Sequence, residues 1–227
     1  MAKNIFLQGT PVLILALMLA VVGCKQDGGG GGDDPDPFLG ETVTISGEQV
    51  YTSDNEGKLS EFTGDLKLKE DSGASGEIKG GKLTLTLVAP TTGLEVIDDD
   101  FGENFDGMWT EVTINPTGVK GLMLEGFEIT DSDKYKVVYR GNVSETSKSI
   151  TQEIVYYMYV DNDVKITGKG ATETDEDGTY KIDNLNLSLK KGWNTVYSKM
   201  SETDTTLTAS VSLRNPKNLK WVLGESD

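Results

Sequence analysis

The sequence predicts an all-β exported domain, folded as an antiparallel β-sandwich or barrel, on three observations. Apolar residues alternate with Ser, Thr and Lys at period two through much of the chain after residue 40, which is typical of strands with one packed and one solvated face. Clusters of Gly, Asp, Asn and Pro separate these segments at intervals expected of a sandwich or barrel. No segment after residue 23 has a convincing helical period.

The alternating segments can be placed in order along the chain. The clearest of them cover residues 42–46, 66–69, 83–87, 135–139, 185–189 and 206–213. Residues suited to turns lie between them at 71–73, 79–81, 115–118, 177–178 and 191–192. Because Gly, Asn and Asp accept the backbone conformations of tight turns, these positions are expected to connect neighbouring strands.

Residues 154–160 differ from the other segments because every position is apolar or aromatic. A strand of this kind is expected to be covered on both faces, so we predict that it lies at the centre of the sheet. Its tyrosines could form a binding platform, since Tyr is enriched at recognition surfaces. Core packing is the favoured interpretation, because aromatic and β-branched residues suit a buried pleated surface.

An acidic loop at residues 90–108 interrupts the strand pattern and is the best internal boundary. It separates an N-terminal β unit, residues 41–89, from a larger C-terminal β domain, residues 109–227. About fifty residues make a marginal independent domain. The two parts are therefore expected to dock into one body.

The first forty residues have a different composition. Lys3 precedes an apolar run at residues 12–22, which has the length of the hydrophobic region of a signal peptide and is short for a membrane span. We therefore expect residues 1–23 to be an export signal. Residues 28–32 are all Gly and residues 33–37 contain only Asp and Pro, so residues 24–40 are predicted to form a disordered tether.

The end of the apolar run, Ala20-Val21-Val22-Gly23-Cys24, resembles the lipobox of bacterial lipoproteins. The resemblance implies that Cys24 is lipidated, that the signal is cleaved before it, and that acyl chains such as palmitate hold the protein in a membrane. Val21 stands where the family more often has Leu. The alternative is an ordinary signal peptide followed by a stray cysteine.

Two further features of the sequence bear on the cellular location of the protein. Lys25 follows the cysteine where an Asp tends to retain lipoproteins of this family in the inner membrane, which favours the cell outer membrane. The C-terminal half, at residues 156–168, 185–197 and 218–223, resembles poorly characterised surface lipoproteins of spirochaete and Bacteroidota type. That resemblance implies a β fold and an exported address on the cell surface, and it implies no activity.

Composition disfavours several classes of function. The chain has a formal net charge of −16, whereas binding to nucleic acid needs clustered Lys or Arg. It has no His, which removes the usual general base and the usual metal ligand. Cys24 is the single cysteine, so no intramolecular disulfide can form. We predict no cofactor.

The favoured function is therefore a non-enzymatic one, in which the β domain binds a surface component, such as a protein or glycan, or serves a structural role in the envelope. The first alternative is a carrier that holds a small apolar ligand in a lipocalin-like barrel. The second is a hydrolase that uses two carboxylates, although nothing marks a pair. Trp109, Trp193 and Trp221 could line a sugar or lipid site, but core packing is favoured.

One acidic segment has a testable metal interpretation. Glu173, Asp175 and Asp177, followed by Gly178, resemble the first half of an EF-hand calcium loop. The twelfth position is Asn184 instead of Glu, and neither flank has a helical pattern. We therefore predict a hairpin turn at Asp177-Gly178 and no metal.

Overall fold

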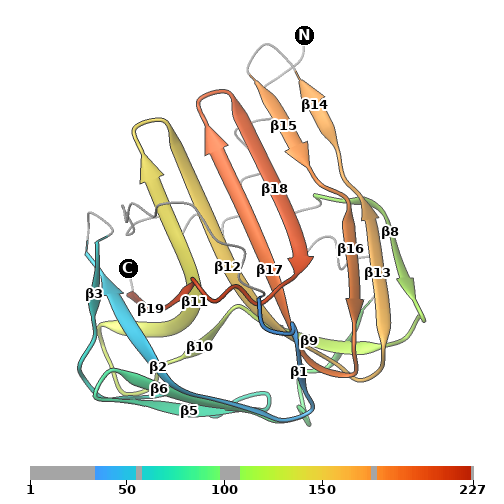
Figure 1. Cartoon of the computed structure of the whole chain (residues 1–227). Coiled ribbons are helices and arrows are strands. Elements are labelled where there is room, and N and C mark those ends of the chain that lie inside the picture. The colour runs from blue at the N-terminus through green and yellow to red at the C-terminus, as the bar shows by residue number, and fades with distance from the viewer. Residues whose placement is uncertain (1–33, 55–57, 98–107, 175–177, 226–227) are drawn as a thin grey trace.

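The protein is described by a computed structural model that covers residues 34–54, 58–97, 108–174 and 178–225. Every regular element in these residues is a β-strand (Figure 1). Most strand pairs are antiparallel, and a large sheet is accompanied by a small one. The prediction of an all-β fold built from antiparallel strands is therefore confirmed. The described part of the chain contains no helix that is long and apolar enough to cross a membrane.

Two long hairpins form the centre of the large sheet. Their strands are β11 (Tyr135–Thr146) with β12 (Ser149–Val160), and β17 (Gly192–Thr203) with β18 (Thr206–Leu213). β12 and β17 pair antiparallel over their whole lengths, from Ser149 opposite Thr203 to Val160 opposite Gly192. The two hairpins consequently stand side by side with their loops at the same end (Figure 1). A shorter hairpin, β14 (Thr172–Thr174) with β15 (Thr179–Ile182), extends the sheet, and β15 runs parallel to β18.

The sheet continues on the other side of β11. β19 (Lys220–Glu225) pairs antiparallel with β11, and β2 (Val43–Ser53) pairs parallel with β19. Beyond β2 lie β6 (Lys82–Leu87), β5 (Ala74–Lys79) and β4 (Leu66–Lys67). Five short strands pair outside this order: β1 (Phe38–Gly40), β3 (Leu59–Glu61), β7 (Glu95–Val96), β9 (Lys120–Leu124) and β10 (Gly126–Glu128). A separate sheet has the order β16 (Leu185–Leu189), β13 (Val164–Lys169) and β8 (Thr110–Asn115).

The turn between β5 and β6 shows how glycine sets this topology. Gly80 and Gly81 have φ of 52° and 76°, the left-handed conformation that two-residue hairpin turns require. A Cβ on Gly81 would lie 1.7 Å from the backbone oxygen of Phe62. Glycine at position 81 therefore both closes the turn and lets the chain at Phe62 approach it.

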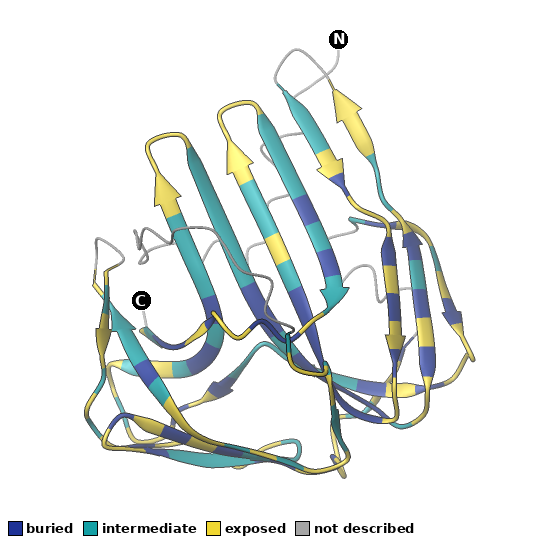
Figure 2. Cartoon of the chain, viewed as in Figure 1, coloured by how far each residue is buried: buried dark blue, intermediate teal, exposed yellow. Residues whose placement is uncertain are grey.

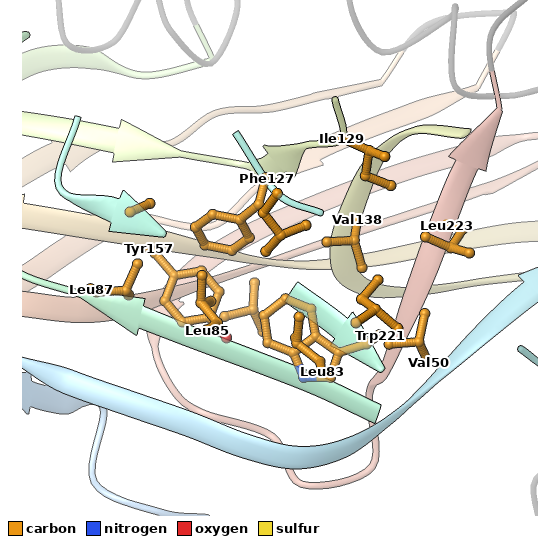
Figure 3. Close-up of a cluster of buried hydrophobic side chains, with 14 of the residues drawn as sticks. Val50, Leu83, Leu85, Leu87, Phe127, Ile129, Val138, Tyr157, Trp221 and Leu223 are labelled. Carbon is orange, nitrogen blue, oxygen red and sulfur yellow. The ribbon is translucent and has the colours of Figure 1, made fainter. Parts of the chain in front are cut away.

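Two hydrophobic cores lie on opposite faces of the long hairpins. The first core is enclosed by the hairpins and the sheet of β2, β6 and β5; it includes Phe127, Tyr157 and Trp221 (Figure 3). The rings of Tyr157 and Trp221 are stacked, with centroids 5.9 Å apart and an interplanar angle of 17°. The second core lies between the hairpins and the small sheet, and it includes Ile166, Leu187 and Val196. The described molecule is thus layered like a sandwich, with the hairpin sheet in the middle.

The prediction for residues 154–160 is confirmed. Val155, Tyr157 and Tyr159 of β12 belong to the first core, whereas Met158 and Val160 belong to the second. Alternate residues of a strand point to opposite faces, so the continuous apolar run reflects a strand buried on both sides. The tyrosines of this strand serve the core.

The first core joins the two parts of the chain that the acidic loop separates. Val50, Ile78 and Leu85 come from the N-terminal unit, and Val155 and Trp193 come from the C-terminal domain. Within the acidic loop itself, β7 pairs with β9 and Ile97 is buried in the second core. Residues 98–107 lie outside the described residues. The two parts therefore share one hydrophobic core.

Residues 34–40, which we call the strap, lie against β17. The N–H of Thr195 donates a hydrogen bond to the carbonyl oxygen of Pro37 at 2.8 Å, and β1 continues the pairing along β17. Arg214 donates two hydrogen bonds to the Asp34 carboxylate, from Nε at 2.9 Å and from Nη2 at 2.7 Å. We expected residues 24–40 to form a disordered tether; the strap is the part of them that the structure describes, and it is held by these bonds.

A fork in the large sheet creates a half-buried acidic position. β11 and β12 pair with each other only from Arg140 and Val155 toward their loop. On the other side of that point, β9 pairs with β12 and β10 (Gly126–Glu128) pairs with β11. Glu125 connects β9 to β10 at the apex of this fork. Burial raises the pKa of the Glu125 carboxyl, because the charged form is poorly solvated there.

Glu125→Gln is expected to raise the melting temperature at pH 7 by about 1–2 °C in a domain of this size. Since the folded-state pKa lies above the unfolded value, protonated Glu125 is favourable below about pH 4, and that contribution is lost as the pH rises through the folded-state pKa. The difference between variant and wild type should therefore vanish near pH 3.5. Thermal melts at both pH values test this, with Glu145→Gln, at an exposed position near the end of β11, as control. A lower melting temperature for Glu125→Gln at pH 7 would contradict it.

Candidate functional site

Burial decreases along the two long hairpins toward their loops (Figure 2). Near the small sheet both faces of β12 and β17 are covered, whereas toward the loops the same strands carry half-buried and exposed side chains. This outer half of the hairpin sheet contributes little to either core. It is therefore the part of the described molecule with most freedom to present side chains to a partner.

One face of the outer hairpins is covered with hydroxyl groups. The strand register places side chains from β11, β12, β17 and β18 on this face in rows, and none of them is buried. We call this set the hydroxyl face: Asn142, Ser144, Thr146, Ser149, Thr151, Glu153, Lys199, Ser201, Thr203, Thr208 and Ser210. All members except Asn142, Glu153 and Lys199 are Ser or Thr. Glu153 lies directly opposite Lys199, so the formal charges on the face balance.

The hydroxyl groups also bond to one another across strands. Thr151 Oγ1 and Ser201 Oγ are 2.9 Å apart between β12 and β17. Thr146 Oγ1 and Ser149 Oγ are 2.9 Å apart at the loop of the first hairpin. Because a hydroxyl group has one donor and two acceptor positions, each retains hydrogen-bonding capacity after these contacts.

The opposite face of the same hairpins has a different composition. Its corresponding rows contain Val143, Ile150, Met200 and Leu207, together with the carboxylates of Glu145 and Glu202 and the amide of Gln152. Apolar and acidic side chains are thus concentrated on one side and hydroxyl groups on the other. The alternation of the strands accounts for this separation.

The base of the hydroxyl face carries a short chain of polar contacts. Tyr197 donates a hydrogen bond from its phenol to the Glu153 carboxylate. The guanidinium carbon of Arg214 lies 5.3 Å from the centre of the Tyr197 ring, and Arg214 binds Asp34 of the strap. Burial, together with the bond to Glu153, raises the pKa of Tyr197. These contacts connect the strap to the face through one aromatic ring.

The second arginine lies beside the first core. Arg140 donates hydrogen bonds to Asn215 Oδ1 and to the carbonyl oxygen of Pro216, both at 2.5 Å. Burial raises the pKa of the neighbouring Tyr157 to about 12, and the charge of Arg140 opposes that rise. The chain has only two arginines, at positions 140 and 214. Arg140 binds the connection between β18 and β19, and Arg214 is the first residue of that connection and binds the strap. The small number of arginines was a feature of the sequence that could have drawn attention to these two positions.

The described part of the chain contains only one of the acidic and cysteine residues that the sequence singled out, Glu173. Cys24, Asp175 and Asp177 lie outside the described residues. Glu173 is exposed on β14, which pairs with β15 as the hairpin that the turn interpretation requires. No group of three or more His, Cys, Asp or Glu side chains in residues 34–54, 58–97, 108–174 and 178–225 is placed to hold a metal ion.

The three tryptophans are core residues. Trp109, Trp193 and Trp221 have 4%, 0% and 2% of their surface exposed, which agrees with the favoured interpretation and leaves no indole on the surface for a sugar or lipid. Trp109 Nε1 donates to the carbonyl oxygen of Asp183 at 2.8 Å, and Trp193 Nε1 donates to that of Val88 at 3.1 Å. Their polar atoms are therefore used within the fold.

Comparison with known proteins adds no relative: no family model, no curated protein and no solved structure matches the chain.

Proposed function

We propose that the protein is a lipid-anchored bacterial lipoprotein of the outer membrane and that its β body is displayed at the cell surface, where it binds an envelope or extracellular component without catalysis. The observation that carries the proposal is Cys24 at the end of an apolar run that has the length of a signal peptide. Acyl chains at the new N-terminus would supply the attachment that an acidic protein cannot obtain from anionic headgroups.

The strap supports this arrangement. Asp34, the first described residue, is ten positions after Cys24, so the anchor and the body can be at most about 35 Å apart. The ion pair of Asp34 with Arg214 and the hydrogen bond of Pro37 with Thr195 join the anchored end to the middle of the body. A force on the tether would therefore be transmitted to β17, a strand that is paired on both sides.

The contacts of the carboxylates at the hydroxyl face and the strap favour a binding role over catalysis. Glu153 accepts the Tyr197 hydrogen bond and Asp34 accepts those of Arg214, so both are engaged within the fold. The chain also contains no His to act as a general base. The lipocalin-like alternative calls for a closed barrel, whereas the described strand order ends at β14 and β4, which do not pair.

Surface display is tested by protease treatment of intact cells of the native host. The expected result is cleavage of the protein while a periplasmic marker stays intact, because a displayed body exposes its hairpin loops to the medium. Lysed cells provide the control for protease sensitivity. Full protection in intact cells, with cleavage after lysis, would contradict surface display and would leave lipid attachment to be judged by its own experiment.

A further inference from the structure

We propose that the hydroxyl face binds a neutral polysaccharide chain. This inference rests on the proposed function and names the class of partner that the displayed body would bind. Its starting point is the contrast between this face and the rest of the molecule. The protein has a formal charge of −16, yet the charged members of the face are one Glu and one Lys opposite each other.

The negative charge of the protein disfavours the binding of anionic polymers to this face. Nucleic acids and acidic polysaccharides are repelled by the negative charge of the protein, since Lys199 is the only cation among the members of the face and lies opposite Glu153, while Arg214 at the base of the face is paired with Asp34. A phospholipid surface would need a basic patch or an apolar one. The hydroxyl face has neither. An uncharged partner experiences no such repulsion.

The chemistry of the side chains selects against a protein partner. Protein interfaces depend on a few large anchors, chiefly Tyr, Trp and Arg, and Ser is depleted in them. The hydroxyl face has no aromatic member, and the nearest ring, Tyr197, is buried. What the face offers is a large number of small groups that can both donate and accept hydrogen bonds. A polysaccharide presents the same kind of group along its whole length.

The strand geometry places the side chains of the hydroxyl face at regular intervals. Neighbouring strands in a sheet lie about 4.8 Å apart, and alternate residues along a strand lie about 6.7 Å apart. The rows through Asn142, Ser144 and Thr146 therefore repeat at a fixed interval across four strands. A repeating chain can use one contact pattern several times on such a surface, so several weak hydrogen bonds add along its length.

The experiment is affinity electrophoresis of the lipidated full-length mature chain in non-ionic detergent. Native gels contain a soluble neutral β-glucan, a neutral α-glucan or a galactomannan, and a gel with polygalacturonate serves as the acidic probe. The proposal predicts retardation by at least one neutral probe and none by polygalacturonate. Retardation by no neutral probe, or stronger retardation by polygalacturonate, overturns it.

A triple variant locates the binding. Thr151→Val, Ser201→Ala and Thr208→Val remove three hydroxyl groups from the centre of the face, and are expected to weaken binding of the retarding glycan about tenfold or more. The matched control is Thr44→Val with Thr86→Val, a cross-strand hydroxyl pair at 3.4 Å on β2 and β6, which should bind like the wild type. Equal loss in both variants, with unchanged melting temperatures, places the binding elsewhere and overturns the proposal.

The same preparation separates this proposal from the proposed function. Partition of the purified chain into the detergent phase of a Triton X-114 solution reports the lipid anchor independently of any glycan. A chain that enters the detergent phase but is not retarded leaves the anchor proposal standing and overturns the glycan proposal. A chain that is retarded but stays in the aqueous phase contradicts the anchor and supports glycan binding.

Discussion

A chain carrying Cys24→Ala is expected to incorporate no labelled palmitate and to accumulate as the full-length precursor. Thioether formation with a diacylglyceryl group needs the thiol, and cleavage of a lipoprotein signal follows that modification. Cys24 is the only cysteine of the chain, so no second thiol can replace it. The measurement is metabolic labelling of cells that express the wild type or the variant, followed by electrophoresis.

Val21→Leu is the matched control for this experiment. It brings the residue three positions before the cysteine to the one more often found in lipoboxes, and it leaves the thiol in place. We expect this variant to be labelled and processed at least as well as the wild type. Equal labelling of Cys24→Ala and wild type would mean that the label is attached elsewhere and that the lipobox interpretation is wrong.

Replacement of Trp193 by alanine is expected to lower the free energy of unfolding by about 3–5 kcal/mol. The side chain is fully buried in the first core, and its ring meets Tyr159 edge to face with centroids 5.5 Å apart. Its Nε1 also donates to the Val88 carbonyl at 3.1 Å, which links β17 to the end of β6. Truncation leaves a cavity and an unpaired carbonyl where both parts of the chain meet.

Trp193→Phe separates these two contributions. It keeps most of the buried ring and removes the hydrogen bond, so a smaller loss of about 1–2 kcal/mol is expected. Urea denaturation monitored by far-ultraviolet circular dichroism measures both variants. A loss below about 1 kcal/mol for Trp193→Ala would show that the first core does not depend on this residue as the packing indicates.

Local patterns in the sequence predict the strands and the central position of β12 because those properties depend on neighbouring residues. The Lys-Gly-Trp-Asn segment is an example whose role becomes clear only in three dimensions. Asn194 is buried and its Nδ2 donates to the carbonyl oxygens of Lys190 and Gly192 at 2.8 and 2.9 Å. A turn was predicted there, and the side chain that fixes it was not.

Pairings between distant segments could not be predicted from the sequence. β2 lies parallel to β19, and β15 lies parallel to β18, although neither pair has a connecting helix, the usual sign of a parallel crossover. The strap was assigned to the tether by its Asp and Pro composition, and its contacts with Arg214 and Thr195 depend on residues more than one hundred positions away. Composition alone gives no sign of such partners.

The hydroxyl face was equally hidden. Ser and Thr alternating with apolar residues in β18 predict a solvated strand face, and one strand cannot show that its neighbours carry the same groups in register. The face exists because β11, β12, β17 and β18 are adjacent. That adjacency is a property of the topology.

The central claim, a lipid anchor at Cys24 joined to a strapped β body, is tested most directly by the intact mass of the mature chain purified from membranes. The account predicts a polypeptide that begins at Cys24 and carries additional mass from a diacylglyceryl group, with or without an N-acyl chain, all of it located on the N-terminal peptide after proteolysis. An unmodified chain, or one that begins at any residue other than Cys24, would contradict it.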